Sequence, residues 1–135
     1  MNISVNTQNG VKNIKVYRPY SFTLGDGKLG RLTLMINRWI TEKCIKRHNI
    51  NPDVVYAHFW TAGYNILSYV KKKRLPFFVI IGEDVINIQN DIAQWEIDDY
   101  CDNVTGVICV STKNQKESVN LGLTKIDKTI VIPML

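Results

Sequence analysis

Short apolar runs alternate along the chain with longer segments in which apolar and polar residues are mixed. Residues 54–58 and 77–81 are rich in β-branched and aromatic side chains, each run ends abruptly in polar residues, and a helix-length segment separates them. A strand, a helix and a strand in this order indicate a βαβ unit with parallel strands. Further strand-like runs occupy residues 104–110 and 129–132. The pattern predicts an α/β fold: a Rossmann-like, doubly wound, mainly parallel sheet with helices on both faces.

Four segments have the periodicity or the end signals of helices. Residues 28–48 have apolar side chains at spacings of three and four, which places the following on one stripe: Leu29, Leu32, Met35 or Ile36, Trp39 and Ile40. A second helix is expected from residue 60 or 61 to about residue 72. The third, residues 90–101, is acidic, and its expected packing residues are Ile92, Trp95, Ile97 and Tyr100. Ser111 is a good N-cap for a fourth helix over residues 112–121, which Gly122 would end.

The first 18 residues predict a hairpin. Residues 3–6 and 11–18 are extended stretches on either side of Asn9-Gly10, a dipeptide that favours the positive-φ turn of a tight hairpin. We expect this hairpin at an edge of the sheet. With 45% apolar and 21% charged residues, the 135 residues are then expected to form a single globular domain.

The charge balance and the cysteines narrow the choice of partner and compartment. A net charge of +5 and a pI near 9.2 favour anionic partners such as a membrane surface, nucleic acid or nucleotide phosphates. Cys44, Cys101 and Cys109 show no CxxC spacing, so neither a disulfide framework nor a zinc site is indicated. No apolar run is long enough to span a bilayer, and no signal-peptide pattern is visible. We therefore expect a cytoplasmic protein, with peripheral contact to the inner face of the cell membrane as an option.

Polar residues follow the first two predicted parallel strands, at the edge of the sheet where ligands bind in such folds. His58 ends one strand, and Gly82-Glu83-Asp84 follows the next. The imidazole of His58 can hydrogen-bond a sugar hydroxyl, and the carboxylates of Glu83 and Asp84 can each accept two hydroxyl hydrogen bonds. The structural alternatives are a histidine satisfied by backbone groups and a turn or helix cap formed by the carboxylates. Gly82 is expected to permit a positive φ or the close approach of a ligand.

Three other features have both a functional and a structural interpretation. Ser111 and the helix N-terminus behind it can hold a phosphate, although helix capping alone explains this residue. Trp60 and Tyr64 can stack on a sugar ring or pack in the core. Residues 71–74, the densest basic run, lie at a helix C-terminus, where solvation is the default and contact with acidic phospholipid is the functional alternative. Nucleic acid is not an expected partner, because no aromatic-interleaved basic motif or helix-turn-helix signal accompanies the run.

Four stretches, taken in order, resemble a known family. They are Asn9-Gly10-Val11-Lys12 leading to Val16-Tyr17-Arg18-Pro19; Pro52-Asp53-Val54-Val55-Tyr56-Ala57-His58; Leu75-Pro76 through Gly82; and Cys101-Asp102 through Ser111, then Leu121-Gly122 and Lys128-Thr129-Ile130-Val131-Ile132-Pro133. Together they span nearly the whole chain. The sequence resembles the N-terminal, acceptor-side domain of family 4 (group 1) GT-B glycosyltransferases, the retaining type used in bacterial polysaccharide assembly.

The resemblance implies the transfer of a hexose from a nucleotide sugar to a polysaccharide or lipid-linked glycan, as in capsule or lipopolysaccharide synthesis. It also implies that the full enzyme has a preceding strand, glycine-rich loop and helix, and a following donor-binding domain, which these 135 residues do not include. No certain catalytic residue, metal or cofactor is expected in this chain, which alone should be inactive; the nucleotide-sugar donor would bind the other domain. The expected cleft-binding residues are His58, Gly82, Glu83, Asp84 and Ser111.

Two further expectations follow from the resemblance. Many family members have a histidine immediately before the glycine at position 82, and it contacts the transferred sugar. This chain has Ile81 there, so either the loop is a Gly-Glu variant or the activity differs. The family's first strand would pair with residues 54–58, and without it we expect that strand to be covered by the N-terminal hairpin, to mediate self-association, or to leave the chain poorly stable.

A flavodoxin-like or receiver-like binding or regulatory module is the alternative from a different functional class. A receiver needs an acidic cluster at the end of its first parallel strand and a lysine at the end of a later one. Here those strands end in Ala57-His58 and Val110-Ser111. The acceptor-side domain of a glycosyltransferase is therefore the favoured expectation.

Overall fold

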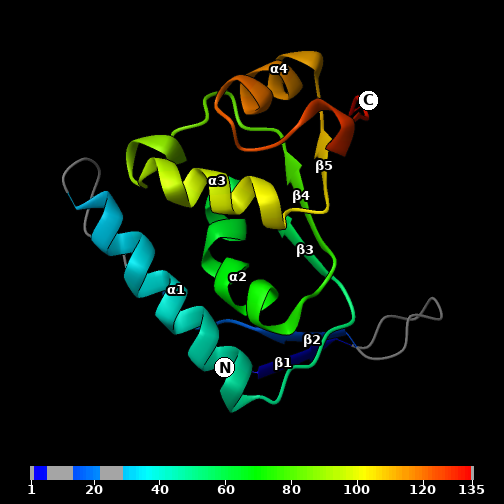
Figure 1. Ribbon diagram of the computed structural model, residues 1–135. Coiled ribbons are helices and arrows are strands. Elements are labelled where there is room, and N and C mark those ends of the chain that lie inside the picture. The colour runs from blue at the N-terminus through cyan, green and yellow to red at the C-terminus, as the bar shows by residue number, and fades with distance from the viewer. Residues whose placement is uncertain (1, 6–13, 22–28, 135) are drawn as a thin grey trace.

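A parallel sheet of four strands forms the centre of the protein (Figure 1). The computed structural model describes residues 2–5, 14–21 and 29–134. The strands are β3 (Val55–His58), β4 (Phe77–Ile81), β5 (Gly106–Cys109) and β6 (Thr129–Val131), and they lie side by side in chain order. The predicted α/β class with a parallel sheet is confirmed.

The helices lie close to their predicted positions. They are α1 (Gly30–Arg47), α2 (Trp60–Lys73), α3 (Gln94–Asn103) and α4 (Thr112–Asn120), with short 3-10 turns η1 (Ile88–Asn90) and η2 (Ile126–Lys128). Ser111 caps α4 as predicted, because its hydroxyl oxygen accepts the Asn114 N–H. Gly122 has a φ of 76°, which suits glycine just beyond the end of that helix. The third helix begins four residues later than predicted, because residues 88–90 form η1 instead.

The N-terminal hairpin is formed by β1 (Asn2–Val5) and β2 (Ile14–Tyr17), which pair antiparallel from Asn2↔Tyr17 to Val5↔Ile14. Its predicted turn at Asn9-Gly10 lies outside the described residues. The pair is a separate two-stranded sheet rather than an edge of the main one. The Tyr17 ring instead contacts the His48 ring beyond the end of α1, with centroids 4.4 Å apart. The hairpin therefore does not cover β3, which forms one edge of the described four-stranded sheet.

The two faces of this sheet differ sharply. Residues paired across parallel strands share a face, so the register sorts them into two sets. One set packs beneath the helices: Val55, Ala57, Phe77, Val79, Ile81, Val107, Cys109 and Val131. The other set is half-exposed or exposed: Tyr56, His58, Phe78, Ile80, Ile108 and Ile130. We call this second set, which is apolar apart from His58, the open face.

The prediction of helices on both faces is therefore wrong for the described residues. In Figure 1, α1, α2 and α3 lie to one side of the strands. The physical reason is the strand order. Parallel crossovers are right-handed, so strands that follow one another in a single direction across the sheet receive all their connecting helices on the same face. Helices cover both faces only where the strand order reverses.

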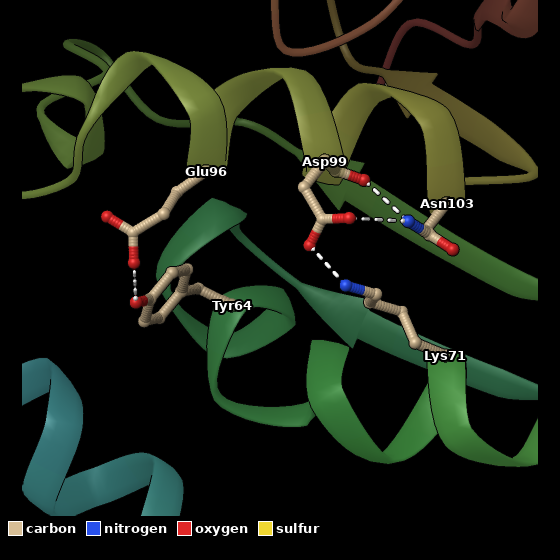
Figure 2. A network of polar contacts seen from close by, with 5 residues as sticks. All are labelled: Tyr64, Lys71, Glu96, Asp99 and Asn103. Carbon is tan, nitrogen blue, oxygen red and sulfur yellow. Dashed lines mark hydrogen bonds and ion pairs between the residues drawn. The ribbon is translucent and has the colours of Figure 1, made fainter.

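The core is centred on α2, whose buried residues Trp60, Tyr64, Leu67 and Val70 pack against the covered face and α3. Tyr100 of α3 is fully buried and donates its hydroxyl to the Trp60 carbonyl oxygen over 3.0 Å. The two helices also share polar contacts (Figure 2). The Tyr64 hydroxyl donates to Glu96 over 2.8 Å, and the Lys71 ammonium lies 2.7 Å from the Asp99 carboxylate.

Glu96 links three helices. Its carboxylate accepts the Tyr64 hydroxyl of α2, the Arg31 guanidinium of α1 at 2.9 Å and the Ala93 N–H at the start of α3 at 2.7 Å. Burial alone would raise the pKa of Glu96, but these hydrogen bonds and the charge of Arg31 outweigh it and hold the pKa below its usual value. The charged carboxylate therefore stabilises the contact of α1 with the rest of the domain.

The predicted stripe of α1 exists but faces outward. The buried residues of this helix are Leu34 and Ile45, whereas Leu32, Met35 and Trp39 are 45%, 54% and 60% exposed. Trp95 of α3 was also expected to pack, and it is 66% exposed. Periodicity groups residues on one side of a helix, but it does not say which side meets the core.

Candidate functional site

A cleft of about 650 Å³ opens at the carboxyl ends of β3 and β4. It lies between the N-terminal halves of α1 and α2 and the segment that follows β4. The lining residues are Gly30, Thr33, Leu34, Asn37, His58, Phe59, Thr61, Ala62, Asn65, Glu83, Val85, Asn87, Ile88 and Asp91. His58 and Glu83, which were predicted to share a rim, therefore both line one cleft.

Phe59 occupies the turn between β3 and α2 in a strained conformation. Its φ of 70° and ψ of 154° fall in a region that only glycine populates readily. Three hydrogen bonds hold the turn: Phe59 N–H to the Ile80 carbonyl at 2.8 Å, Trp60 N–H to Glu83 at 3.0 Å, and Gly63 N–H to the Phe59 carbonyl at 3.1 Å. The Phe59 side chain is 47% exposed in the cleft. Such strain persists only where the surroundings enforce it, and it is concentrated at functional sites.

Glu83 is fixed from both its side chain and its backbone. One carboxylate oxygen accepts the Trp60 N–H at the start of α2, and its carbonyl accepts the Asn114 side-chain amide at 2.7 Å. Burial raises the pKa of Glu83; the Trp60 hydrogen bond opposes this and the charge of Glu117 adds to it. The hydrogen bond to Trp60 uses one carboxylate oxygen. The second oxygen has no hydrogen bond to another described residue, so Glu83 combines a structural role with a free acceptor at the cleft.

His58 is exposed at the end of β3 on the open face and at the cleft. Its ring lies edge-on to Tyr56 and Phe59, with centroids 5.0 Å and 6.4 Å away. These neighbours are aromatic and do not hold the imidazole by a hydrogen bond. The ring therefore packs against aromatic neighbours at the cleft.

Three of the expected site residues do not line this cleft. The Ser111 hydroxyl is used within its own helix, where it accepts the Asn114 N–H and donates to the Asn114 side-chain oxygen at 2.8 Å. Asp84 is exposed, and its carbonyl accepts Lys113. Gly82 does not have a positive φ, and a side chain there would first meet Val110 at 3.2 Å. Of the two roles expected for Gly82, the positive φ is wrong, and the close approach of a ligand stays a prediction.

Burial shows where three other residues singled out in the sequence lie. Trp60 and Tyr64 are 0% and 2% exposed, so they belong to the core and do not present a ring to a ligand. The ring in the cleft belongs to the neighbouring Phe59. Ile81 is fully buried on the covered face, so the position before Gly82 faces the core and not the cleft.

Several lining residues have no strong sequence signal. Asn65 lies one turn into α2, and its side-chain oxygen is buried without a hydrogen-bond partner among the described residues. The Asp91 carboxylate packs against Gly30 so closely that a side chain at position 30 would overlap it. An acidic group beside the start of α1 is favoured by the helix dipole. The spacing of helix residues could have placed Asn65 near His58, but the pairing of Asp91 with Gly30 depends on the tertiary fold.

The charge of the cleft differs from that of the whole protein. Among the described lining residues Glu83 and Asp91 are acidic, and there is no lysine or arginine. Most of the positive charge is elsewhere, including residues 71–74 at the opposite end of α2. Within the part of the chain that the structure describes, no group of three or more His, Cys, Asp and Glu side chains is placed to hold a metal ion. The cleft is suited to a neutral ligand rich in hydroxyl groups more than to a phosphate.

Comparison with protein-family models and with curated protein sequences gives no match. Over the described residues, no helix is both long enough and apolar enough to cross a membrane.

Proposed function

We propose that this chain is the acceptor-side part of a retaining glycosyltransferase, and that its cleft binds a sugar of the glycan acceptor. The observation that carries the proposal is the composition of the cleft. An exposed ring, Phe59, stands beside hydrogen-bonding groups of His58, Asn65, Glu83 and Asp91, in the absence of lysine or arginine from the described lining. Apolar contact combined with a few placed polar groups is how concave sites fix small polar ligands.

Each lining group has a defined part in this proposal. The free carboxylate oxygen of Glu83 accepts a sugar hydroxyl, and the unsatisfied Asn65 oxygen accepts another. His58 has one nitrogen that donates and one that accepts when the ring is neutral, so it can contact either end of a hydroxyl group. The Phe59 ring covers the apolar C–H face of the sugar. The nucleotide-sugar donor and the phosphate chemistry are assigned to a second domain, in line with the sequence resemblance.

Ligand titration followed by NMR tests this function. We expect short hexose-containing glycans to shift the amide signals of residues 58–65 and 83–91, and nucleotide sugars or Mg²⁺ alone to leave them in place. Asn65→Ala should weaken glycan binding about ten-fold, since one hydrogen bond to a buried acceptor is lost. Asn120→Ala is the matched control, because Asn120 is exposed at the end of α4 outside the cleft.

Two results would contradict the proposal. Shifts on adding Mg²⁺ without any effect of glycans would favour the regulatory module. Equal loss of glycan binding in the Asn65 and Asn120 variants would show that the glycan binds elsewhere.

A further inference from the structure

The outward side of α1 has a composition that is unusual for a helix exposed to water. Leu32, Met35 and Trp39 occupy its first half and are 45%, 54% and 60% exposed, and Lys43 and Lys46 continue the same line in its second half. Spacings of three and four residues put these five side chains within about 80° of the helix circumference. Buried Leu34 and Ile45 lie on the opposite side. We call these five residues the outer stripe.

More cations and aromatic rings adjoin the basic half of the outer stripe. A hollow of about 330 Å³ lies between α1 and residues 17–20, and its lining includes Arg18, Tyr20 and Arg47. Tyr20 is 93% exposed. The Lys43 ammonium lies over the Trp39 ring, 4.7 Å from its centroid, so the indole and the cation act at one place on the surface.

The basic end of α2 lies at the same pole of the protein. The Tyr69 hydroxyl, in the last turns of α2, donates to the Ile50 carbonyl just beyond α1 over 3.0 Å. This contact brings Lys72, Lys73 and Arg74, all exposed, to the side where α1 ends. Lys71 differs from them because Asp99 neutralises it. A cluster of exposed positive charges thus lies at the end of the protein where α1 and α2 terminate, away from the cleft.

From this arrangement we propose that the outer stripe docks the protein on an anionic lipid surface, with α1 lying in the plane of the membrane interface. Leucine, methionine and tryptophan side chains enter the boundary between headgroups and acyl chains, and Trp and Tyr favour that depth. The lysines and arginines meet the negative headgroups. The helix is about 27 Å long, so the whole stripe can lie on the surface at once.

Two other partners, a second copy of the protein and nucleic acid, fit the outer stripe less well than a lipid surface does. Two copies that packed their outer stripes in parallel would bring Lys43 and Lys46 of each copy together, and like charges would repel. Two copies that packed antiparallel would place these ammonium groups against the apolar half of the other stripe, where no negative charge pairs with them. Nucleic acid would satisfy the cations but would leave Leu32 and Met35 without apolar contact. An anionic lipid surface satisfies both halves of the stripe.

Vesicle binding tests the proposal in a variant whose only exposed tryptophan belongs to the outer stripe. Trp60 is fully buried, so in a Trp95→Phe protein Trp39 is the single exposed indole. We expect its fluorescence to shift to the blue with phosphatidylcholine vesicles that contain phosphatidylglycerol. Pure phosphatidylcholine should give a much smaller shift, and added salt should reduce the shift with the anionic vesicles.

Vesicle co-sedimentation of variants distinguishes binding through the outer stripe from non-specific adsorption of exposed apolar residues. Replacing Lys43, Lys46 and Arg47 together by Gln should weaken binding about a hundred-fold, since each cation near an anionic surface contributes about a factor of five. Trp39→Ala should weaken it at least about ten-fold. Trp95→Ala is the matched control, because Trp95 is 66% exposed but lies on acidic α3, and it should bind as the unmodified protein does.

Other outcomes would overturn the proposal. These are no binding to anionic vesicles, equal binding to neutral and anionic vesicles, equal loss in the Trp39 and Trp95 variants, or binding to RNA that lipid does not compete for. Thermal unfolding confirms that each variant is folded. Lipid docking does not depend on what the cleft binds: vesicle binding with no glycan binding would support this inference while contradicting the proposed function.

Discussion

The strain at Phe59 leads to a prediction in which the usual effect of glycine is reversed. Glycine is normally less stable than alanine by about 0.5–1 kcal/mol, because it loses more backbone entropy on folding. At Phe59 the positive φ imposes a cost on any residue with a Cβ atom, of order 1–3 kcal/mol for a conformation of this kind. Phe59→Ala keeps that cost, whereas Phe59→Gly removes it. Both variants lose the same half-exposed ring, so the lost apolar contact cancels in their comparison.

The difference in unfolding free energy between the glycine and alanine variants follows from these two terms. Relief of strain minus the ordinary glycine penalty leaves Phe59→Gly more stable than Phe59→Ala by about 1 kcal/mol. This corresponds to a rise in Tm of about 3–5 °C for a domain of this size. Urea unfolding and thermal unfolding of both variants measure it. Lys116, exposed within α4, provides the control, because Lys116→Ala should be more stable there than Lys116→Gly by about 1 kcal/mol.

The result that would refute the reasoning is an alanine variant at position 59 that is as stable as the glycine variant, or more so. Such a result, with the normal order at Lys116, would mean that the turn before α2 relaxes when the ring is removed. The strain would then not be enforced by the hydrogen bonds to Ile80 and Glu83.

Two further predictions concern half-buried Glu83 and buried Gly63, which both lie near the same turn. Burial raises the pKa of Glu83 above its usual 4.5, so just above that pH the native state holds a proton that the unfolded chain releases, and stability falls as the pH rises. Glu83→Gln keeps an acceptor for the Trp60 N–H and should remove this decline in urea unfolding across pH 4 to 7; an unchanged decline would exclude Glu83 as its source. Gly63→Ala should cost about 1–3 kcal/mol, because the new methyl group meets the Tyr100 hydroxyl, and part of the cost should disappear when Tyr100→Phe removes that oxygen. Simple additivity of the two changes in thermal unfolding would contradict that contact.

The sequence predicted the features that depend on neighbours along the chain. Strand positions followed from the β-branched runs, and the ends of α4 followed from Ser111 and Gly122, whose local hydrogen-bonding and backbone preferences act within a few residues. His58 and Glu83 were placed on a common rim because the carboxyl ends of adjacent parallel strands must meet.

The features that the sequence did not predict depend on contacts between distant segments. The run Phe77–Ile81 is apolar throughout, and such a run is compatible with a strand covered on one face or on both. The sequence therefore did not show that one face of the sheet is open. The stripe of α1 was visible, but its outward direction depends on how Arg31 and Glu96 fix the helix to the domain. Phe59 and Trp60 are adjacent aromatic residues, and only the left-handed turn decides which one enters the cleft.

The order of the strands also bears on how the chain folds. Because β3, β4, β5 and β6 lie side by side in chain order, each new helix and strand packs on the unit formed just before it. Among the described strands, none has to be inserted between two that are already paired. Each step therefore closes only the loop of one crossover, and the larger entropic cost of closing longer loops does not arise. The sheet can therefore grow in one direction as the chain is synthesised. Among the two edge strands of the described sheet, β6 has three residues and β3 has four, so β6 is the one that should fray first.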